Sequence, residues 1–234
     1  MKVLLAITLL LLSMASHAEE CVILLHGLAR TASSMSDIED RLTDEGYKVV
    51  NVDYPSRDGT IEELAELAVS EGLADCNSTE SSSIHFVTHS MGGILVRQYL
   101  SQNIIEKLGR TVMLGPPNQG SEVVDKLGEM PGFEFINGPA GMQLGTGTHD
   151  VPQSLGPANF EVGIIAGTRS INLILSVLIP DTDDGKVSLE SAHLENETDF
   201  IEMPVAHPFM MHNEEVIDNI VHFLKNGVFM DSQV

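Results

Sequence analysis

Short apolar runs recur along the chain and are separated by stretches whose apolar residues have helical spacing. The runs predict six buried strands. They lie near residues 21–25, 47–52, 84–88, 111–114, 161–166 and 199–203. Helices are predicted between them and after Asn213, where an amide side chain suits a helix start. Alternating strands and helices indicate an α/β fold, with a mostly parallel six-stranded sheet and helices on both faces.

Residues 116–158 interrupt this alternation, because they are dense in glycine and proline and keep a helical pattern only near 121–127. We expect a small irregular insertion, either a lid or a static decoration, inside one domain that spans residues 19–234. The very apolar segment 171–179 fits a helix or a loop equally well.

The first 18 residues carry Lys2, an apolar run, and small residues at Ser16 and Ala18. This order is typical of a secretory signal peptide and predicts a secreted or periplasmic protein without a stable membrane anchor. Both cysteines, Cys21 and Cys76, precede predicted strands, so both side chains are expected at one edge of the sheet. An even cysteine count in an exported chain then favours one disulfide between them.

The chain has 34 acidic and 12 basic residues, a formal net charge of −22. Such a surface repels nucleic acid and anionic lipid, which excludes both as expected partners. Three arginines, Arg30, Arg57 and Arg169, are conspicuous in so acidic a chain. Surface ion pairs would account for them, and we assign them no catalytic role.

The segment from Thr88 to Gly93, THSMGG, joins a predicted strand to a predicted helix. This is the context of a nucleophile elbow, in which a serine projects from a sharp turn. Ser90 would then be the nucleophile, flanked by His89 and Met91, and Gly92 would let the helix pack closely on the sheet. The amide of Met91 at the helix start would face developing negative charge.

Five stretches together resemble the α/β-hydrolases of the bacterial lipase and esterase type. They are VILLHGLART at 22–31, VVNVDYPSR at 49–57, THSMGGILVR at 88–97, DTDDGKVS at 181–188 and PVAHPFMM at 204–211. The resemblance covers nearly all of residues 19–234 and is weakest at 121–158. Thr88 departs from the glycine that is usual at that position. The resemblance implies hydrolysis of an acyl ester or lipid, without a metal or other cofactor.

The resemblance also implies roles for individual residues. The His26-Gly27 pair would shape a loop whose Leu28 amide joins the Met91 amide in an oxyanion hole. A catalytic acid and then a histidine follow the serine in this family. His207, just after the last strand, is the expected base, with His212 as the alternative. Asp184, before Gly185, is the expected acid, with Asp183 next.

We therefore expect a carboxylesterase or lipase with a Ser90–His207–Asp184 triad. Alternatives are another acyl transfer by the same triad, as in a thioesterase, phospholipase or acyltransferase, and a noncatalytic binding protein of the same fold. Residues 171–179 and the PFMM stretch at 208–211 are candidates for an acyl pocket. The sequence leaves chain-length preference and oligomeric state open.

Overall fold

The computed structural model describes residues 19–77, 81–171, 179 and 182–230. The predicted signal peptide lies outside these residues, as does most of the apolar segment 171–179. Within the described part of the chain, no helix is both long enough and apolar enough to cross a membrane.

The six predicted strands form one sheet in the order β2-β1-β3-β4-β5-β6, and every neighbouring pair is parallel. The sheet is therefore entirely parallel, which confirms the predicted fold class. The strand that was expected to begin at 111 begins three residues earlier. The bounds are β1 Cys21–Leu25, β2 Lys48–Val52, β3 Ile84–His89, β4 Leu108–Leu114, β5 Val162–Gly167 and β6 Asp199–Met203.

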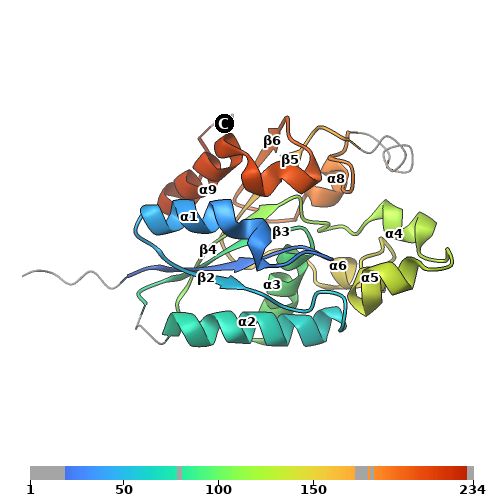
Figure 1. Cartoon of the computed structure of the whole chain (residues 1–234), viewed down its shortest axis with the longest axis horizontal. Helices are drawn as coiled ribbons and strands as arrows, with labels where there is room; N and C mark the ends of the chain where they lie inside the picture. The colour runs from blue at the N-terminus through green and yellow to red at the C-terminus, as the bar shows by residue number, and fades with distance from the viewer. Residues whose placement is uncertain (1–18, 78–80, 172–178, 180–181, 231–234) are drawn as a thin grey trace, which may run out of the picture.

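Helices cover both faces of this sheet (Figure 1). One face carries α1 (Ser36–Asp44) and α9 (Glu214–Asn226), and the other carries α2 (Ile61–Asn77) and α3 (Met91–Gln102). Every residue of β1, β3 and β5 is buried, because helices shield both sides of these strands. This is why the sequence shows continuous apolar runs rather than alternation. The remaining helical segments are short: η1 Ala32–Met35, α4 Glu122–Leu127, α5 Phe133–Met142, α6 Val151–Ser154, α8 Leu189–Ala192 and η2 His207–His212.

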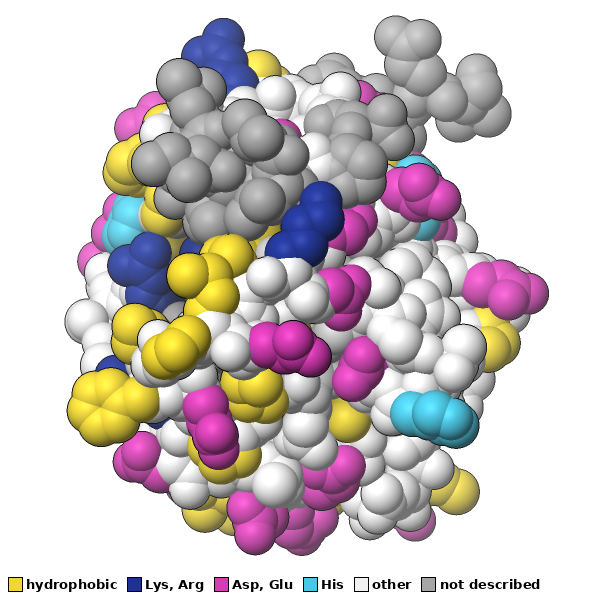
Figure 2. Space-filling model, turned by 90° about the vertical axis from the view of Figure 1, so that its right-hand side faces the viewer, with side chains coloured by type: hydrophobic (Ala, Val, Ile, Leu, Met, Phe, Trp, Pro, Cys, Tyr) yellow, Lys and Arg dark blue, Asp and Glu magenta, His cyan; other side chains and the backbone are white. Residues whose placement is uncertain are grey.

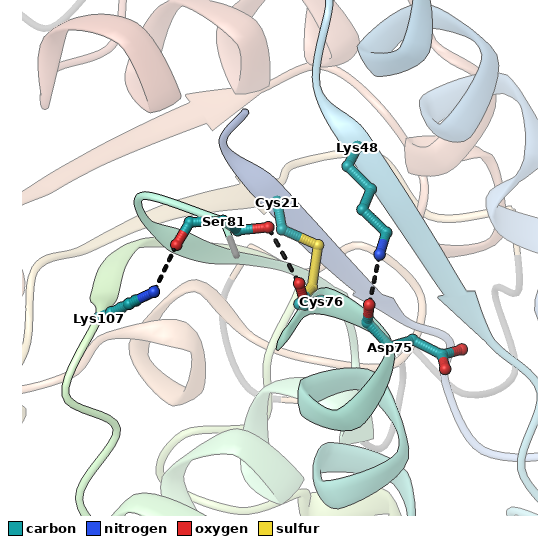
Figure 3. The surroundings of a disulfide bond; sticks show 6 residues. All are labelled: Cys21, Lys48, Asp75, Cys76, Ser81 and Lys107. Carbon is teal, nitrogen blue, oxygen red and sulfur yellow. Dashed lines mark hydrogen bonds between the residues drawn. A yellow bond between two sulfur atoms is a disulfide. The ribbon is translucent and has the colours of Figure 1, made fainter. Parts of the chain in front are cut away.

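The predicted disulfide is confirmed: Cys21 and Cys76 are joined, with their Cα atoms 5.8 Å apart. Cys76 lies at the end of α2 rather than directly before a strand. Figure 3 shows how this end of the helix is held: the Ser81 hydroxyl donates to the Cys76 carbonyl at 3.1 Å, and Lys107 donates to the Ser81 carbonyl at 2.9 Å. Lys48 of β2 donates to the Asp75 carbonyl. The cross-link thus ties α2 to the amino-terminal edge of the sheet.

The irregular insertion 116–158 carries α4, α5 and α6 beyond the carboxyl ends of the strands (Figure 1). A single buried side chain of α3, Arg97, holds both ends of the insertion. Its guanidinium donates to the carbonyl and the side-chain oxygen of Asn118, and to the carbonyls of Pro152 and Gly156. Burial without a carboxylate partner lowers the pKa of Arg97 to about 10.

Candidate active site

Ser90 occupies the sharp turn between β3 and α3. Its backbone has φ 55° and ψ −123°, in the left-handed half of conformational space that residues other than glycine rarely adopt. Such a conformation costs on the order of 1–3 kcal/mol and persists only where surrounding contacts impose it. Here the Ser90 amide donates to the Leu114 carbonyl at 2.8 Å, and the Gly93 amide donates to the Ser90 carbonyl at 3.0 Å. The turn exposes the serine at the carboxyl edge of the sheet.

The two small residues around this turn are required by close contact. A Cβ atom on Gly92 would lie 2.5 Å from the Leu25 carbonyl oxygen, which belongs to the backbone of β1. A Cβ atom on Gly27 would lie 2.9 Å from Nδ1 of His89 and 3.1 Å from Cβ of Ser90. Both positions therefore exclude a side chain. At Thr88, where the sequence departs from the usual glycine, the side chain is completely buried.

Asp184 and His207 form a buried pair. Nδ1 of His207 donates to Oδ2 of Asp184 at 2.7 Å, and the His207 amide donates to the Asp184 carbonyl at 2.9 Å. The other carboxylate oxygen of Asp184 accepts from the amides of Lys186 and Val187, at 3.0 and 2.9 Å. Asp184 is 1% exposed and His207 is 2% exposed. The carboxylate therefore fixes the ring so that Nε2 is available for another proton.

The two alternative residues lie elsewhere. The Asp183 carboxylate accepts from the Gly185 amide at 2.6 Å, in its own turn. His212 pairs with Asp37 at 2.8 Å on the surface. The Asp184 carboxylate, and not either alternative, is the group that accepts from Nδ1 of His207.

Gly115 connects this pair to the serine turn. It directly follows Leu114, whose carbonyl holds the Ser90 amide. A Cβ atom on Gly115 would lie 2.9 Å from both Oδ2 of Asp184 and Nδ1 of His207. The end of β4 therefore packs against the serine turn on one side and the acid–histidine pair on the other. His207 Nε2 is buried and has no hydrogen-bond partner in the described part of the chain.

His89, directly before the serine, supports the backbone of His207. Its Nε2 donates to the His207 carbonyl at 3.1 Å, and the two ring centroids are 4.6 Å apart. Burial lowers the pKa of His89 well below its ordinary value, and the nearby His207 ring lowers it further. A neutral His89 can make this contact without placing a positive charge beside the second ring.

The loop after β1, residues 26–30, forms a tight turn beside Ser90. The Gly27 carbonyl accepts from Nδ1 of His26 at 2.9 Å and from the Arg30 amide at 3.2 Å. Ala29 adopts a positive φ of 56°. The amides of Leu28 and Met91 make no hydrogen bond to any described residue. Two main-chain donors are thus available beside Ser90.

Contacts with Tyr54 hold the side chain and the carbonyl of His26, the first residue of that loop. Its ring stacks on Tyr54, with centroids 4.1 Å apart and planes 10° apart, and the Tyr54 hydroxyl donates to the His26 carbonyl. Burial lowers the pKa of His26. The neutral ring keeps Nδ1 as the donor to Gly27.

A cavity of about 240 Å³ opens at Ser90. Its lining is mostly apolar and comes largely from the insertion, which sequence reasoning did not identify as a substrate pocket. The lining residues are Leu28, Ser90, Pro117, Ser121, Val123, Val124, Leu127, Phe133, Asn137, Leu144, Lys186 and Val187.

The PFMM stretch, a candidate for an acyl pocket, does not line this cavity. Met210 and Met211 are buried in the core cluster beneath α1 and α9, and Phe209 is half exposed outside the cavity. Ile171 is exposed and Ile179 is buried, while residues 172–178 lie outside the described part of the chain.

The three conspicuous arginines have no ion pair with the described residues. Within residues 19–77, 81–171, 179 and 182–230, Arg30, Arg57 and Arg169 have no carboxylate within 4 Å. The described residues also contain no cluster of three or more histidine, cysteine or acidic side chains suited to a metal ion.

Comparisons with known proteins identify the family. Residues 22–181 match the Alpha/beta hydrolase family, so the chain belongs to that family. No curated protein sequence gives a significant match.

Among solved structures, the mature lipase BlEst2 of Bacillus licheniformis superposes with a TM-score of 0.72 at 18% identity, covering 88% of this chain and 92% of the lipase. The Pyrococcus furiosus esterase Pf2001 gives a TM-score of 0.58 at 18% identity, with coverages of 89% and 83%. Phospholipase PlaB of Legionella pneumophila gives 0.59 at 20% identity, with coverages of 74% and 45%. At such identities these similarities establish the fold alone.

Proposed function

We propose that this α/β-hydrolase is a serine carboxylic-ester hydrolase, with Ser90 as nucleophile, His207 as general base and acid, and Asp184 as the group that orients His207. The amides of Leu28 and Met91 form its oxyanion hole. The observation that carries the proposal is the meeting of a strained, accessible serine with a buried Asp184–His207 pair at one end of β4.

The reaction follows from these roles. His207 Nε2 takes the proton of Ser90 as its oxygen attacks the ester carbonyl, and the two amides bind the resulting oxyanion. His207 then gives the proton to the leaving alcohol, which departs and leaves an acyl-serine. Water, activated by the same nitrogen, attacks the acyl-serine and releases the acid. Asp184 stays ionised and stabilises the imidazolium that forms in each half of the reaction.

The unpaired Nε2 of His207 supports this assignment. A buried ring nitrogen without a partner is uncommon and calls for an explanation. The hydrogen bond between nucleophile and base is often long before substrate binds, so a free Nε2 beside the serine turn fits a resting hydrolase.

The apolar cavity at Ser90 supports a short acyl group as the preferred substrate. Its volume of about 240 Å³ lies below the roughly 300–1,000 Å³ of pockets that enclose drug-sized ligands. In a series of p-nitrophenyl esters, kcat/KM should therefore be greatest for short chains. A monotonic increase to long chains would show that the acyl group binds elsewhere.

We propose further that the enzyme acts outside the cytoplasm. The Cys21–Cys76 disulfide fits an oxidising compartment, and the predicted signal peptide is consistent with it. Detection of the chain, shortened at its amino terminus, in a periplasmic or culture-medium fraction would support export. Retention of the full-length chain in the cytoplasm would refute it.

The direct test is Ser90→Ala, assayed with p-nitrophenyl butyrate. We expect kcat to fall by at least about 10³-fold, since loss of a triad serine removes covalent catalysis. Ser82→Ala is the matched control, because Ser82 is an exposed serine at the opposite edge of the sheet, before β3. Retained activity in Ser90→Ala would refute the assignment.

A further inference from the structure

The described cations of this acidic protein divide into two groups by position. At the amino-terminal edge of the sheet, each cation named here has a partner. Arg41, Arg110 and Lys225 pair with a carboxylate at 3.0 Å or less, and Lys48 and Lys107 donate to backbone carbonyls. At the carboxyl edge, beside the candidate active site, Arg30 and Lys186 have no carboxylate within 4 Å among the described residues. In a chain with 34 acidic side chains, cations without partners at this edge need an explanation.

Both cations lie close to the reacting groups. Lys186 lines the same cavity as Ser90, and its amide is one of the donors to Asp184. Arg30 lies in the loop after β1, and its amide donates to the Gly27 carbonyl. Burial lowers the pKa of the Lys186 ammonium and the positive charge of Arg30 lowers it further, while the negative charge of Asp184 opposes both effects.

The surroundings on the Arg30 side are also polar. Arg30 and Arg57 share an open cavity of about 500 Å³ with Thr31 and Ser56. Two carboxylates, Asp53 and Asp58, border this cavity too. Asp53 is engaged, since it accepts from the Ala32 amide at 2.9 Å, and neither carboxylate comes within 4 Å of the arginines. Figure 2, which faces this end of the molecule, shows lysine and arginine side chains next to hydrophobic ones.

We propose that the substrate ester carries a negatively charged group, a phosphate or a carboxylate, which Arg30 and Lys186 bind beside Ser90. This inference rests on the proposed esterase function. The apolar cavity takes the hydrocarbon part of the substrate, and the two cations take its anionic oxygens by charge-assisted hydrogen bonds. Uncharged esters then lack one of the contacts that hold the substrate in place.

The test uses two matched substrate pairs. The first pair is 1-hexanoylglycerol and 1-hexanoylglycerol 3-phosphate, which places the charge on the alcohol half. The second pair is p-nitrophenyl valerate and mono-p-nitrophenyl glutarate, which places it on the acyl half. The measured quantity is the ratio of kcat/KM for the charged member to kcat/KM for the neutral member, in the wild-type protein and in Arg30→Gln, Lys186→Gln and Lys225→Gln.

We expect the ratio to exceed one in at least one pair, and that pair identifies the half that carries the charge. Each of Arg30→Gln and Lys186→Gln should lower it about tenfold, the loss typical of one hydrogen bond to a charged group. Lys225→Gln removes the same charge at the far edge and should leave the ratio unchanged. Raising the salt concentration from about 20 mM to about 0.5 M should lower the ratio in the wild-type protein, because mobile ions screen exposed charges.

Three results would overturn the inference: no preference for either charged ester, a preference that both substitutions leave intact, or an equal loss in Lys225→Gln. Failure of the proposed function looks different, because hydrolysis of the neutral esters would then survive Ser90→Ala. A Ser90-dependent esterase with no charge preference would refute only the anionic substrate.

Discussion

The serine turn and the insertion at 116–158 border the same cavity, yet they are built in opposite ways. In β3, before Ser90, every residue is buried, and Gly92 packs directly on the backbone of β1. In the insertion, α4 has no buried residue, and Phe135 on α5 is 91% exposed. Sheet contacts impose the geometry of the turn, whereas separate hydrogen bonds hold the insertion. Arg97 binds both of its ends, and the Ala140 amide donates to the Gly59 carbonyl at 3.0 Å.

This difference shows which part of the site holds its atoms most tightly. Reaction chemistry needs atoms held within a fraction of an ångström, and the side chains of Asp184 and His207 are almost completely buried. The insertion contributes apolar surface to the cavity, a role that tolerates variation in side chains. Substitutions at the turn should therefore affect the reaction and the fold severely, and substitutions in the insertion should mainly change its local order.

The largest expected effect distinguishes Asp184 from its neighbour. Asp184→Asn should lower kcat by about 10⁴-fold, because an amide cannot stabilise the imidazolium and favours the wrong ring tautomer. Asp183→Asn is the matched control and should lower kcat by less than about tenfold, since Asp183 accepts from Gly185 in its own turn. Steady-state kinetics with p-nitrophenyl butyrate decides between them, and the reverse ranking would exclude Asp184 as the acid.

Two glycine substitutions compare the packing of the serine turn with that of the exposed start of α5. Gly92→Ala places a Cβ atom 2.5 Å from a backbone oxygen and should reduce the free energy of unfolding by about 3 kcal/mol. Gly132→Ala, before α5, meets no atom within 4 Å and should cost only about 1 kcal/mol, for its left-handed conformation. Urea unfolding measures both. Equal costs would mean that the serine turn adapts as readily as the exposed start of α5.

Removal of the Arg97 guanidinium should make residues 116–158 less ordered. Arg97→Gln leaves the Pro152 and Gly156 carbonyls without their donor and should cost about 2 kcal/mol. Limited proteolysis should then cut preferentially within 116–158. Arg41→Gln removes surface ion pairs only and should cost under about 1 kcal/mol without new cleavage. Unchanged protease resistance in Arg97→Gln would show that other contacts hold the insertion.

The smallest expected effect is the dependence of stability on pH. Burial lowers the pKa of His26, His85 and His89, so the unfolded chain binds protons below about pH 6.5 that the folded chain does not. Stability should therefore fall as the pH decreases below that value, by up to about 1.4 kcal/mol per pH unit for each such histidine.

Urea unfolding between about pH 7.5 and pH 5.5 tests this dependence. His85→Asn should reduce the slope of stability against pH, whereas His149→Asn, an exposed position in the insertion, should leave it unchanged. A slope unaffected by His85→Asn would contradict the proposed source of the pH dependence.

The same contrast explains how much the sequence predicts. The strands, their order of appearance and the serine turn depend on local patterns and nearest-neighbour packing, so the sequence predicts them well. The Asp184–His207 contact joins residues 23 positions apart and was expected through family resemblance rather than periodicity. The reading of Asp184 over Asp183 depended on the glycine that follows it.

The features that sequence reasoning missed depend on long-range contacts. Arg97 sits within an apolar helix, and nothing in its neighbourhood indicates that it binds carbonyls up to 59 residues away. Phe133, Asn137 and Leu144 lie in the part of the insertion without periodicity, so their shared contact with the cavity leaves no local signal. For Lys186, its position two residues after the expected acid was a signal that could have been used.

The central claim is that Ser90 is a nucleophile activated by His207. The most direct measurement is intact-protein and peptide mass spectrometry after brief reaction with a fluorophosphonate, which forms a stable phosphonyl ester with an activated serine. We predict one adduct per chain, located on the peptide that contains Ser90, absent in Ser90→Ala and formed far more slowly in His207→Gln. Ester hydrolysis that continues with Ser90 unmodified, or an adduct confined to another residue, would contradict the account.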